Sequence, residues 1–169
     1  KFLSDPLKLA ALSSACSIIE FALPDREKHE PIFSGLNILI AALEKKNIWP
    51  NIYIRLELGI LKELGFELDL SSCAATGTKK NLVYVSPKTG RAVSQKAGQK
   101  YHSRMLKLPK ILVDQSIEPR LIDVAEALTL TEYFFERYCI YSEKQNVPAA
   151  RRRFVEKLMT YDSNQPSID

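Results

Sequence analysis

The basic side chains of one continuous segment are the residues of this chain best suited to chemistry. Between Asp69 and Asp114 the sequence has no carboxylate, yet this stretch carries nine of the 24 lysines and arginines. The remainder holds 15 basic and 20 acidic residues, so the net charge of +4 conceals a strong separation of sign. Positive charge gathered in this way attracts polyanions and releases their counterions. The segment therefore indicates a nucleic-acid partner; the alternative is a solvated basic loop that only keeps the protein soluble.

Two groups of basic residues are candidates for contact with phosphate. The first lies within the carboxylate-free segment and comprises Lys79, Lys80, Lys88, Arg91, Lys96, Lys100 and Arg104. The second is the run Arg151, Arg152 and Arg153 at the start of the last expected helix. Because consecutive residues lie about 100° apart on a helix, at most two of these three can face one partner, and a solvated helix face is the alternative. No recognition-helix pattern accompanies either group, so the predicted binding is independent of base sequence.

A second pattern has the spacing of a metal site. The four positions of a C-x2-C…C-x2-C zinc ribbon are occupied by Cys73, Thr76, Ser94 and Ala97. Zinc is bound by thiolate, imidazole or carboxylate, so Cys73 is the one ligand among them, and the nearby His102 does not complete a site. We predict that this segment binds no metal and is held together by the packing of Leu70, Leu82 and Val85. A chance match is the alternative, because five-residue turns that end in glycine are common.

Enzymatic chemistry is poorly supported by the sequence. His29 and His102 lie near no recognisable nucleophile motif, and the chain has neither a Gly-rich phosphate loop nor H-E-x-x-H. Nearby lysines could lower the pKa of Cys73 and make it a reactive thiol, but a structural remnant of the metal frame is the favoured interpretation. We therefore predict no catalytic residue and no cofactor.

The composition is that of an ordinary globular domain, 46% hydrophobic and 26% charged. No apolar run approaches the roughly 20 residues that span a bilayer, and no signal peptide opens the chain, so no membrane partner is expected. The cysteines are odd in number and widely spaced, which favours a reducing cytoplasm over a disulfide framework. Two of them lie in apolar helical patterns and are predicted to be small core residues, namely Cys16 and Cys139.

Residues 1–66 are expected to form three amphipathic helices. The first begins at Asp5-Pro6 and ends at Pro24-Asp25, with a stripe of Leu12, Cys16, Ile19 and Leu23 and with Ala15 and Ala22 beside it. The second has its stripe at Leu36, Leu39, Ile40 and Leu43. The third begins near Pro50, ends at Gly65, and carries Tyr53, Leu56, Ile60 and Leu64. Each stripe must be buried against another helix.

The periodicity changes after these helices. Residues 69–98 are predicted to form an inserted basic β-hairpin, because two β-prone runs flank the turn-forming residues 86–90. Residues 101–161 return to helix, with a short helical piece from Met105 to Leu108, a long helix over about 119–142, and a last helix from Pro148 through Met159. Residues 162–169 are expected to be a disordered tail. The sequence thus predicts one mainly α domain, a helical bundle with a small zinc-ribbon-like β-hairpin insertion that has lost its metal ligands.

The long helix carries an aromatic stripe that has two interpretations. A base-stacking platform is one, but aromatic residues at helical spacing in an apolar segment favour the core. The residues concerned are Tyr133, Phe134, Phe135, Tyr138 and Tyr141.

Several stretches of the chain occur in the same order in a known family. They are residues 64–70 with Cys73 and Gly77, then 84–93, 106–109, 128–131 and 148–152. In these stretches the chain resembles the RecO family of bacterial recombination mediators over nearly its whole length. Some members of the family carry a four-cysteine zinc site at positions matching the frame described above. Three of those cysteines are replaced here, which puts metal binding in doubt but not the fold.

The resemblance implies the C-terminal helical part of that family's fold, without its N-terminal OB-fold. The chain starts without Met, and we expect it to be a portion of a longer protein. The implied function is to bind single- and double-stranded DNA, anneal strands and assist RecA loading, with RecR and the acidic tail of single-stranded DNA-binding protein as partners.

The alternative is a protein-binding adaptor whose own DNA binding is negligible without the OB-fold. An acidic tail needs an apolar groove between helices with a cationic rim. Candidate rim residues are Arg55, Arg120 and Arg137.

Overall fold

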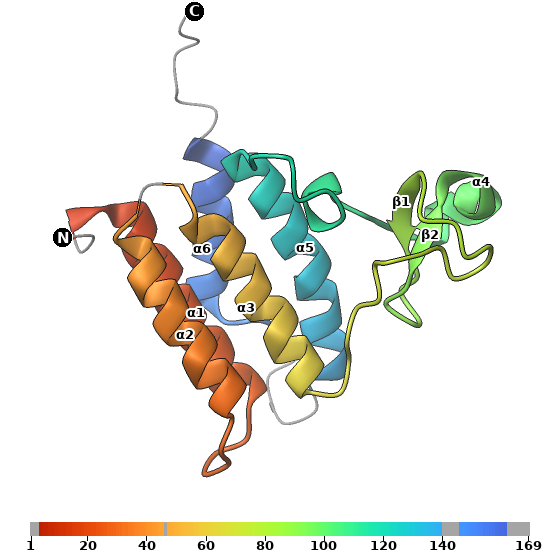
Figure 1. Cartoon of the computed structure of the whole chain (residues 1–169). Coiled ribbons are helices and arrows are strands. Elements are labelled where there is room, and N and C mark those ends of the chain that lie inside the picture. Colours follow the sequence, from red (N-terminus) through yellow and green to blue (C-terminus); the bar gives the residue numbers. More distant parts are fainter. Residues whose placement is uncertain (1–3, 46, 140–145, 162–169) are drawn as a thin grey trace, which may run out of the picture.

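Helices make up most of the protein. The computed structural model describes residues 4–45, 47–139 and 146–161. Within these residues, five long helices pack into a bundle (Figure 1), namely α1 (Pro6–Ala22), α2 (Glu30–Leu43), α3 (Trp49–Glu63), α5 (Leu121–Tyr138) and α6 (Ala149–Tyr161). The prediction of a mainly helical fold is confirmed, and no helix among the described residues is long and apolar enough to cross a bilayer.

Short-range signals in the sequence set the ends of the helices. The Asp5 carboxylate caps α1 by accepting hydrogen bonds from the backbone N–H groups of Leu7 and Lys8, at 3.0 and 3.3 Å. Pro50 lies in the first turn of α3, where its missing N–H costs no helical hydrogen bond. Gly65 follows α3 with a φ of +82°, a left-handed conformation that suits glycine. The predicted starts of α1 and α3 and the predicted end of α3 are confirmed.

The buried face of α1 differs from the predicted stripe. Cys16 is exposed, and Ala11, Ala15 and Ile18 are fully buried instead. The small side chains allow α1 to lie close against α6, its main neighbour. The alanines predicted beside the stripe, Ala15 and Ala22, are fully buried, whereas Leu12 and Ile19 of the stripe are half-buried. Cys139 is half-buried, so the prediction that both cysteines are core residues is wrong for Cys16.

The aromatic stripe of α5 belongs to the core. Phe134 and Phe135 are fully buried, which supports the core interpretation over a base-stacking platform. The ring of Phe66, from the segment after α3, stacks on Tyr138 and Phe134 with centroids 3.9 and 5.0 Å away. Tyr141 and residues 140–142 of the predicted helix lie outside the described residues, as does the predicted tail 162–169.

The inserted segment forms a three-stranded antiparallel sheet, with β1 (Leu82–Val85) between β2 (Ala92–Ser94) and β3 (Leu106–Lys107). A short helix α4 (Gln95–Gly98) and the 3₁₀ helix η2 (Gln99–Arg104) connect β2 to β3, and a second 3₁₀ helix, η3 (Lys110–Leu112), follows. The prediction of a helical piece over Met105–Leu108 is wrong: Leu106 and Lys107 pair with the free edge of β1. We call residues 69–108 the ribbon.

The ribbon projects from one side of the bundle, beyond α5 (Figure 1). Its base is anchored by Gly90, whose φ of +65° closes the hairpin turn and whose missing side chain makes room for Leu68 and Phe66. The Tyr138 hydroxyl of α5 donates to the Lys88 carbonyl at 3.3 Å. Val85 and Ala92 are fully buried and belong to the same apolar cluster as the helices. The ribbon is therefore packed onto the bundle at its turn end, and α4 lies at its outer end.

Candidate nucleic-acid interface

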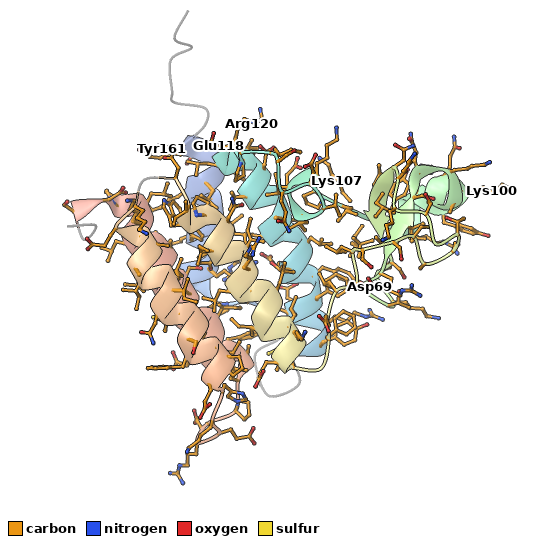
Figure 2. All side chains as sticks on the ribbon, viewed as in Figure 1. Asp69, Lys100, Lys107, Glu118, Arg120 and Tyr161 are labelled. Atoms are coloured by element: carbon orange, nitrogen blue, oxygen red, sulfur yellow. The ribbon has the colours of Figure 1, made fainter. Side chains whose placement is uncertain are left out.

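The basic residues of the ribbon reach solvent. Lys79, Lys80, Lys88, Arg91, Lys96, Lys100 and Arg104 are all exposed. Figure 2 shows Lys100 at the outer end of the ribbon and Asp69 on the connection nearer to the bundle. An exposed cation can approach a phosphate without first losing an internal partner, so exposure is the first requirement of a phosphate-binding surface.

The hairpin divides these cations into two groups. Lys80 precedes β1 and Lys96 follows β2, and the register pairs Leu82 with Ser94, so both lysines lie at the open end of the hairpin. Lys88 lies in the turn at the opposite end, about 13 Å away along a four-residue strand. The sequence prediction treated the cations as one set, and the structure separates them along the strand axis.

Two basic side chains of the segment have acidic partners. Arg91 Nε lies 3.3 Å from Asp69 Oδ2, and Lys107 Nζ lies 2.8 Å from Glu126 Oε1. Arg91 therefore has an internal competitor for its charge, although the sequence has no carboxylate between Asp69 and Asp114. Six of the predicted contacts form no ion pair with a described carboxylate, and they are Lys79, Lys80, Lys88, Lys96, Lys100 and Arg104.

Arg151 is excluded as a DNA contact by its burial. Its side chain is 0% exposed and forms two hydrogen bonds with Glu57 of α3, at 2.8 and 2.9 Å. A third nitrogen, Nη1, donates to Glu132 of α5 at 2.6 Å. The arginine run therefore splits: Arg151 faces the core, whereas Arg152 and Arg153 are exposed. The prediction that Arg151 contacts DNA is corrected, because a guanidinium with two internal carboxylates is not offered to a phosphate.

The surroundings of this arginine complete a polar core. Thr131 donates to the Glu57 carboxylate, and Arg151 Nη2 donates to the Leu128 carbonyl at 2.7 Å. Burial, followed by the nearby Glu57 charge, raises the pKa of Tyr53 well above its usual value, so its phenol stays neutral. The sequence offered one signal for this network: Glu57 occupies the buried face of α3, four residues after Tyr53.

Cys73 and Ser94, two positions of the zinc-ribbon frame, meet in the structure. The backbone N–H of Ser94 donates to Cys73 Sγ at 3.2 Å, and the thiol is buried. Burial raises the pKa of Cys73, but hydrogen bonds from the side chains of Ser94 and Thr76 and from two backbone N–H groups outweigh it and lower the pKa to about 6. Hydrogen bonds, and not the predicted lysines, therefore stabilise a thiolate at this position.

The fold of the ribbon around this cysteine rests on protein contacts. Val85 is fully buried, and Leu70 and Leu82 pack half-buried against the core, as the packing prediction required. In the part of the chain that the structure describes, no three His, Cys, Asp or Glu side chains form a group that could hold a metal ion.

The three predicted rim cations lie on different surfaces. Arg55 lines a groove of about 380 Å³ between α2 and α3, together with Ile38 and Leu56. Arg120 precedes α5 and forms a two-pronged hydrogen bond with Asp123, at 3.0 Å for each nitrogen. Arg137 lies over the Tyr138 ring, 5.8 Å from its centroid. Arg55 alone of the three candidate rim residues lines the α2–α3 groove.

Two glycines outside the predicted site residues shape the α2–α3 groove. Gly35 faces Leu56 across the groove, where an added Cβ would lie 3.1 Å from a Leu56 methyl group. Gly59 leaves room on α3, with Ile32 3.9 Å from its would-be Cβ. Because glycine weakens a helix, a glycine in the interior of each of two paired helices signals a close approach or a hollow between them.

Comparisons with known proteins identify relatives across most of the chain. The family model described as recombination protein O C terminal matches residues 3–145. The DNA repair protein RecO of Rhodospirillum centenum is 48% identical over 157 residues, which cover 92% of this chain and 62% of the relative. The DNA repair proteins RecO of Caulobacter sp. (strain K31) and Methylorubrum populi are 46% and 44% identical, over 91% and 79% of this chain and 63% and 56% of their own lengths.

The chain thus spans a little under two thirds of the length of the curated relatives that it matches first. No solved structure matches it. The names of the relatives designate DNA repair proteins and name no chemical reaction. The matched helices and ribbon make this chain a member of the RecO family, in the region that the C-terminal model of recombination protein O describes.

Proposed function

We propose that this protein acts in DNA repair and recombination as a non-enzymatic mediator that binds DNA through its ribbon. One observation carries the proposal: six exposed cations on the ribbon form no ion pair with any described carboxylate. Such side chains can bind phosphates without first breaking an ion pair within the protein. Because they contact the phosphates and not the bases, they do not distinguish base sequences. The names of the relatives support the same role.

The proposed contacts are those that the structure leaves available. Lys79, Lys80, Lys96 and Lys100 form the outer group, Lys88 lies at the turn, and Arg104 ends η2. Arg91 is a weaker candidate because Asp69 competes for its guanidinium. Arg152 is exposed at the start of α6 and remains in the proposal, whereas Arg151 does not.

A titration of labelled DNA at two salt concentrations tests this proposal. Fluorescence anisotropy with a single-stranded oligothymidylate and with a duplex should show binding to both at about 50 mM salt. Raising the salt to about 200 mM should weaken binding steeply, with a slope in log K of about −0.7 per contacted phosphate on a single strand. The absence of binding at low salt, or binding that ignores salt, would overturn the proposal.

The partner proteins and the assembled activity follow from the family resemblance. We propose that the mediator anneals complementary strands and assists RecA loading together with RecR, in the cytoplasm. More than a third of the length of these relatives lies outside the match, so these activities are proposed for a protein of the relatives' full length. Annealing is tested by fluorescence resonance transfer between complementary labelled strands, with the ribbon variants below as the comparison.

A specific observation favours a second function, recognition of an acidic tail by the α2–α3 groove. The groove is lined mainly by apolar side chains, by Arg55 and Lys62, and by Glu63, whose carboxylate lies 3.0 Å from His29 Nδ1. Lys62 forms an ion pair with Glu67, with 2.9 Å between Nζ and Oε1. Arg55 is therefore the cation best placed to bind a carboxylate of the tail. An acidic peptide that ends in an apolar residue with a free carboxylate fits both features, and single-stranded DNA-binding protein is the proposed source.

Calorimetric titration with such a peptide tests this second function. Arg55→Ala should weaken the binding of the peptide by about tenfold, because it removes a charged hydrogen-bond donor for the carboxylate. DNA binding should not change, because Arg55 lies outside the ribbon. Arg152→Ala is the matched control, since it removes an exposed arginine that does not line the groove. Equal losses in both variants would contradict this site.

A further inference from the structure

A hollow at the open end of the hairpin has a lining that suits a nucleotide. It measures about 520 Å³, within the roughly 300–1,000 Å³ of small-ligand sites. Its lining consists only of hydroxyl, amide and ammonium side chains, with neither a carboxylate nor an apolar residue among them. We infer that this hollow seats one unpaired nucleotide of a single DNA strand, an inference that rests on the DNA binding proposed above.

Two lysines line the hollow and would bind the phosphate. Lys80 comes from the segment before β1 and Lys96 from α4 after β2, so the pairing of the two strands brings both to the same hollow. Both are exposed and neither forms an ion pair with a described carboxylate. Two ammonium groups that line one hollow can bind the oxygens of a single phosphate.

Three amide side chains also line the hollow and would contact the base. Gln95 and Gln99 come from α4 and η2, and Asn81 has a φ of +54° that bends the chain before β1. The Asn81 carbonyl accepts the Gln95 N–H at 2.9 Å, which fixes the two segments against each other. An amide offers both donors and an acceptor, so the same three side chains can serve the edge of any base. The hollow therefore favours a base without selecting its identity.

The size of the hollow favours an unpaired nucleotide over a duplex. A duplex presents phosphates on a convex backbone, and its base edges are occupied by pairing. A single strand can turn one base out of line and place both base and phosphate in a recess. The six available cations of the ribbon attract both forms of DNA, whereas the hollow adds contacts for the single strand alone.

The hydrogen bonds beneath the hollow keep its floor in place. Thr76 and Ser94 line the hollow, and both hydrogen-bond to the buried Cys73 sulfur. Two positions of the zinc-ribbon frame, Thr76 and Ser94, thus contact the Cys73 sulfur and also form part of a polar wall of the hollow.

A charge-matched pair of double variants tests the inference in the full chain. Lys80→Gln with Lys96→Gln removes the two cations of the hollow, and Lys79→Gln with Lys88→Gln removes two cations outside it. We expect the first pair to lose about tenfold more affinity for oligothymidylate than for a duplex, measured by anisotropy at low salt. The control pair should weaken the binding of both forms of DNA by similar factors, because it removes only nonspecific electrostatic attraction.

A neutral substitution separates the base contact from the charge. Gln99→Leu should weaken the binding of oligothymidylate several-fold without changing the dependence of affinity on salt. An oligonucleotide made of abasic sites should bind the wild type and the Gln99→Leu variant with equal affinity. If the two double variants reduce single-strand and duplex binding in the same ratio, or if the abasic strand binds as tightly as oligothymidylate, the inference is overturned. A wild type that binds neither form of DNA would instead remove the proposed function itself.

Discussion

Arg151 and Glu57 lie fully buried against each other although 94 residues separate them, and the guanidinium donates to both carboxylate oxygens. This pair joins α6 to α3, and Glu132 adds a tie to α5. A buried charge is tolerated only when a partner and hydrogen bonds replace its water, and this network supplies both. The arginine run at the start of α6 therefore fixes the last helix in the bundle, and its outer members remain available to solvent.

Removal of one partner of this pair should destabilise the protein strongly. Arg151→Ala leaves the buried Glu57 carboxylate without its cation, and we expect a loss of about 3–5 kcal/mol in the free energy of unfolding. Glu57→Gln should cost less, because Arg151 keeps its ion pair with Glu132. Chemical denaturation followed by circular dichroism measures it. Arg152→Ala, one residue along, is the control and should change stability by less than about 0.5 kcal/mol. Similar losses of stability for Arg151→Ala and Arg152→Ala would show that the buried ion pair of Arg151 does not stabilise the fold.

The packing of the ribbon against the bundle should depend on Gly90. A Cβ at this residue would lie 2.6 Å from Leu68 Cδ2 and 3.0 Å from Phe66 Cε1, and the Phe66 ring is held by its stack on Tyr138. Gly90→Ala should therefore lower the melting temperature and reduce the near-ultraviolet circular dichroism of the aromatic stack.

Gly77→Ala is the control for this substitution. Gly77 has a similar φ of +70° but no atom within 4 Å of a would-be Cβ, so the alanine there costs only the backbone strain of about 1–2 kcal/mol. The difference between the two variants isolates the contact with Phe66 and Leu68. No difference would mean that this contact does not hold the ribbon.

Local signals in the sequence were sufficient for most helix ends and for the hairpin. Asp5, Pro50 and Gly65 each act within one helical turn, so the sequence alone reveals their effect. The strand β3 was missed because its pairing with β1 depends on a distant edge and not on its own residues. The burial of Arg151 was missed for the same reason, since its acceptor lies on another helix.

The candidate site was predicted in composition but not in arrangement. The absence of carboxylates between Asp69 and Asp114 identified the ribbon, because charge can be counted from the sequence. The division of the cations between the two ends of the hairpin required the strand register. The hollow near Lys80 and Lys96 required the positions of α4 and η2, neither of which was expected.

The Cys73 thiolate should make stability depend on pH. The folded pKa is about 6, below the free-thiol value of about 8.5, so between these values the unfolded chain binds the extra proton. The free energy of unfolding should therefore rise with pH across this window, by at most about 1.4 kcal/mol per unit from this group, and the gain is lost as pH falls through 6.

Cys73→Ala should remove this rise, which denaturation at pH values on both sides of the window measures. Cys16→Ala is the control because Cys16 is exposed. Burial raises the pKa of Cys139 to about 11, so that thiol opposes stability only above the free-thiol value and outside the window. A wild type and a Cys73→Ala variant with parallel pH profiles would disprove the hydrogen-bonded thiolate.

The α2–α3 groove should be closed by a larger residue at Gly59. A Cβ there has ordinary room, 3.9 Å from Ile32, so Gly59→Leu can enter without displacing backbone and its branched end fills the groove. Leucine also favours helix over glycine by roughly 1 kcal/mol, so the variant should keep or gain stability. We expect calorimetry to show that the variant no longer binds the acidic peptide. Its affinity for oligothymidylate should not change, because the substitution lies outside the ribbon. Retained peptide binding in a folded Gly59→Leu variant would place the peptide elsewhere on the bundle, and lost binding to both ligands would show that groove and ribbon do not act as separate sites.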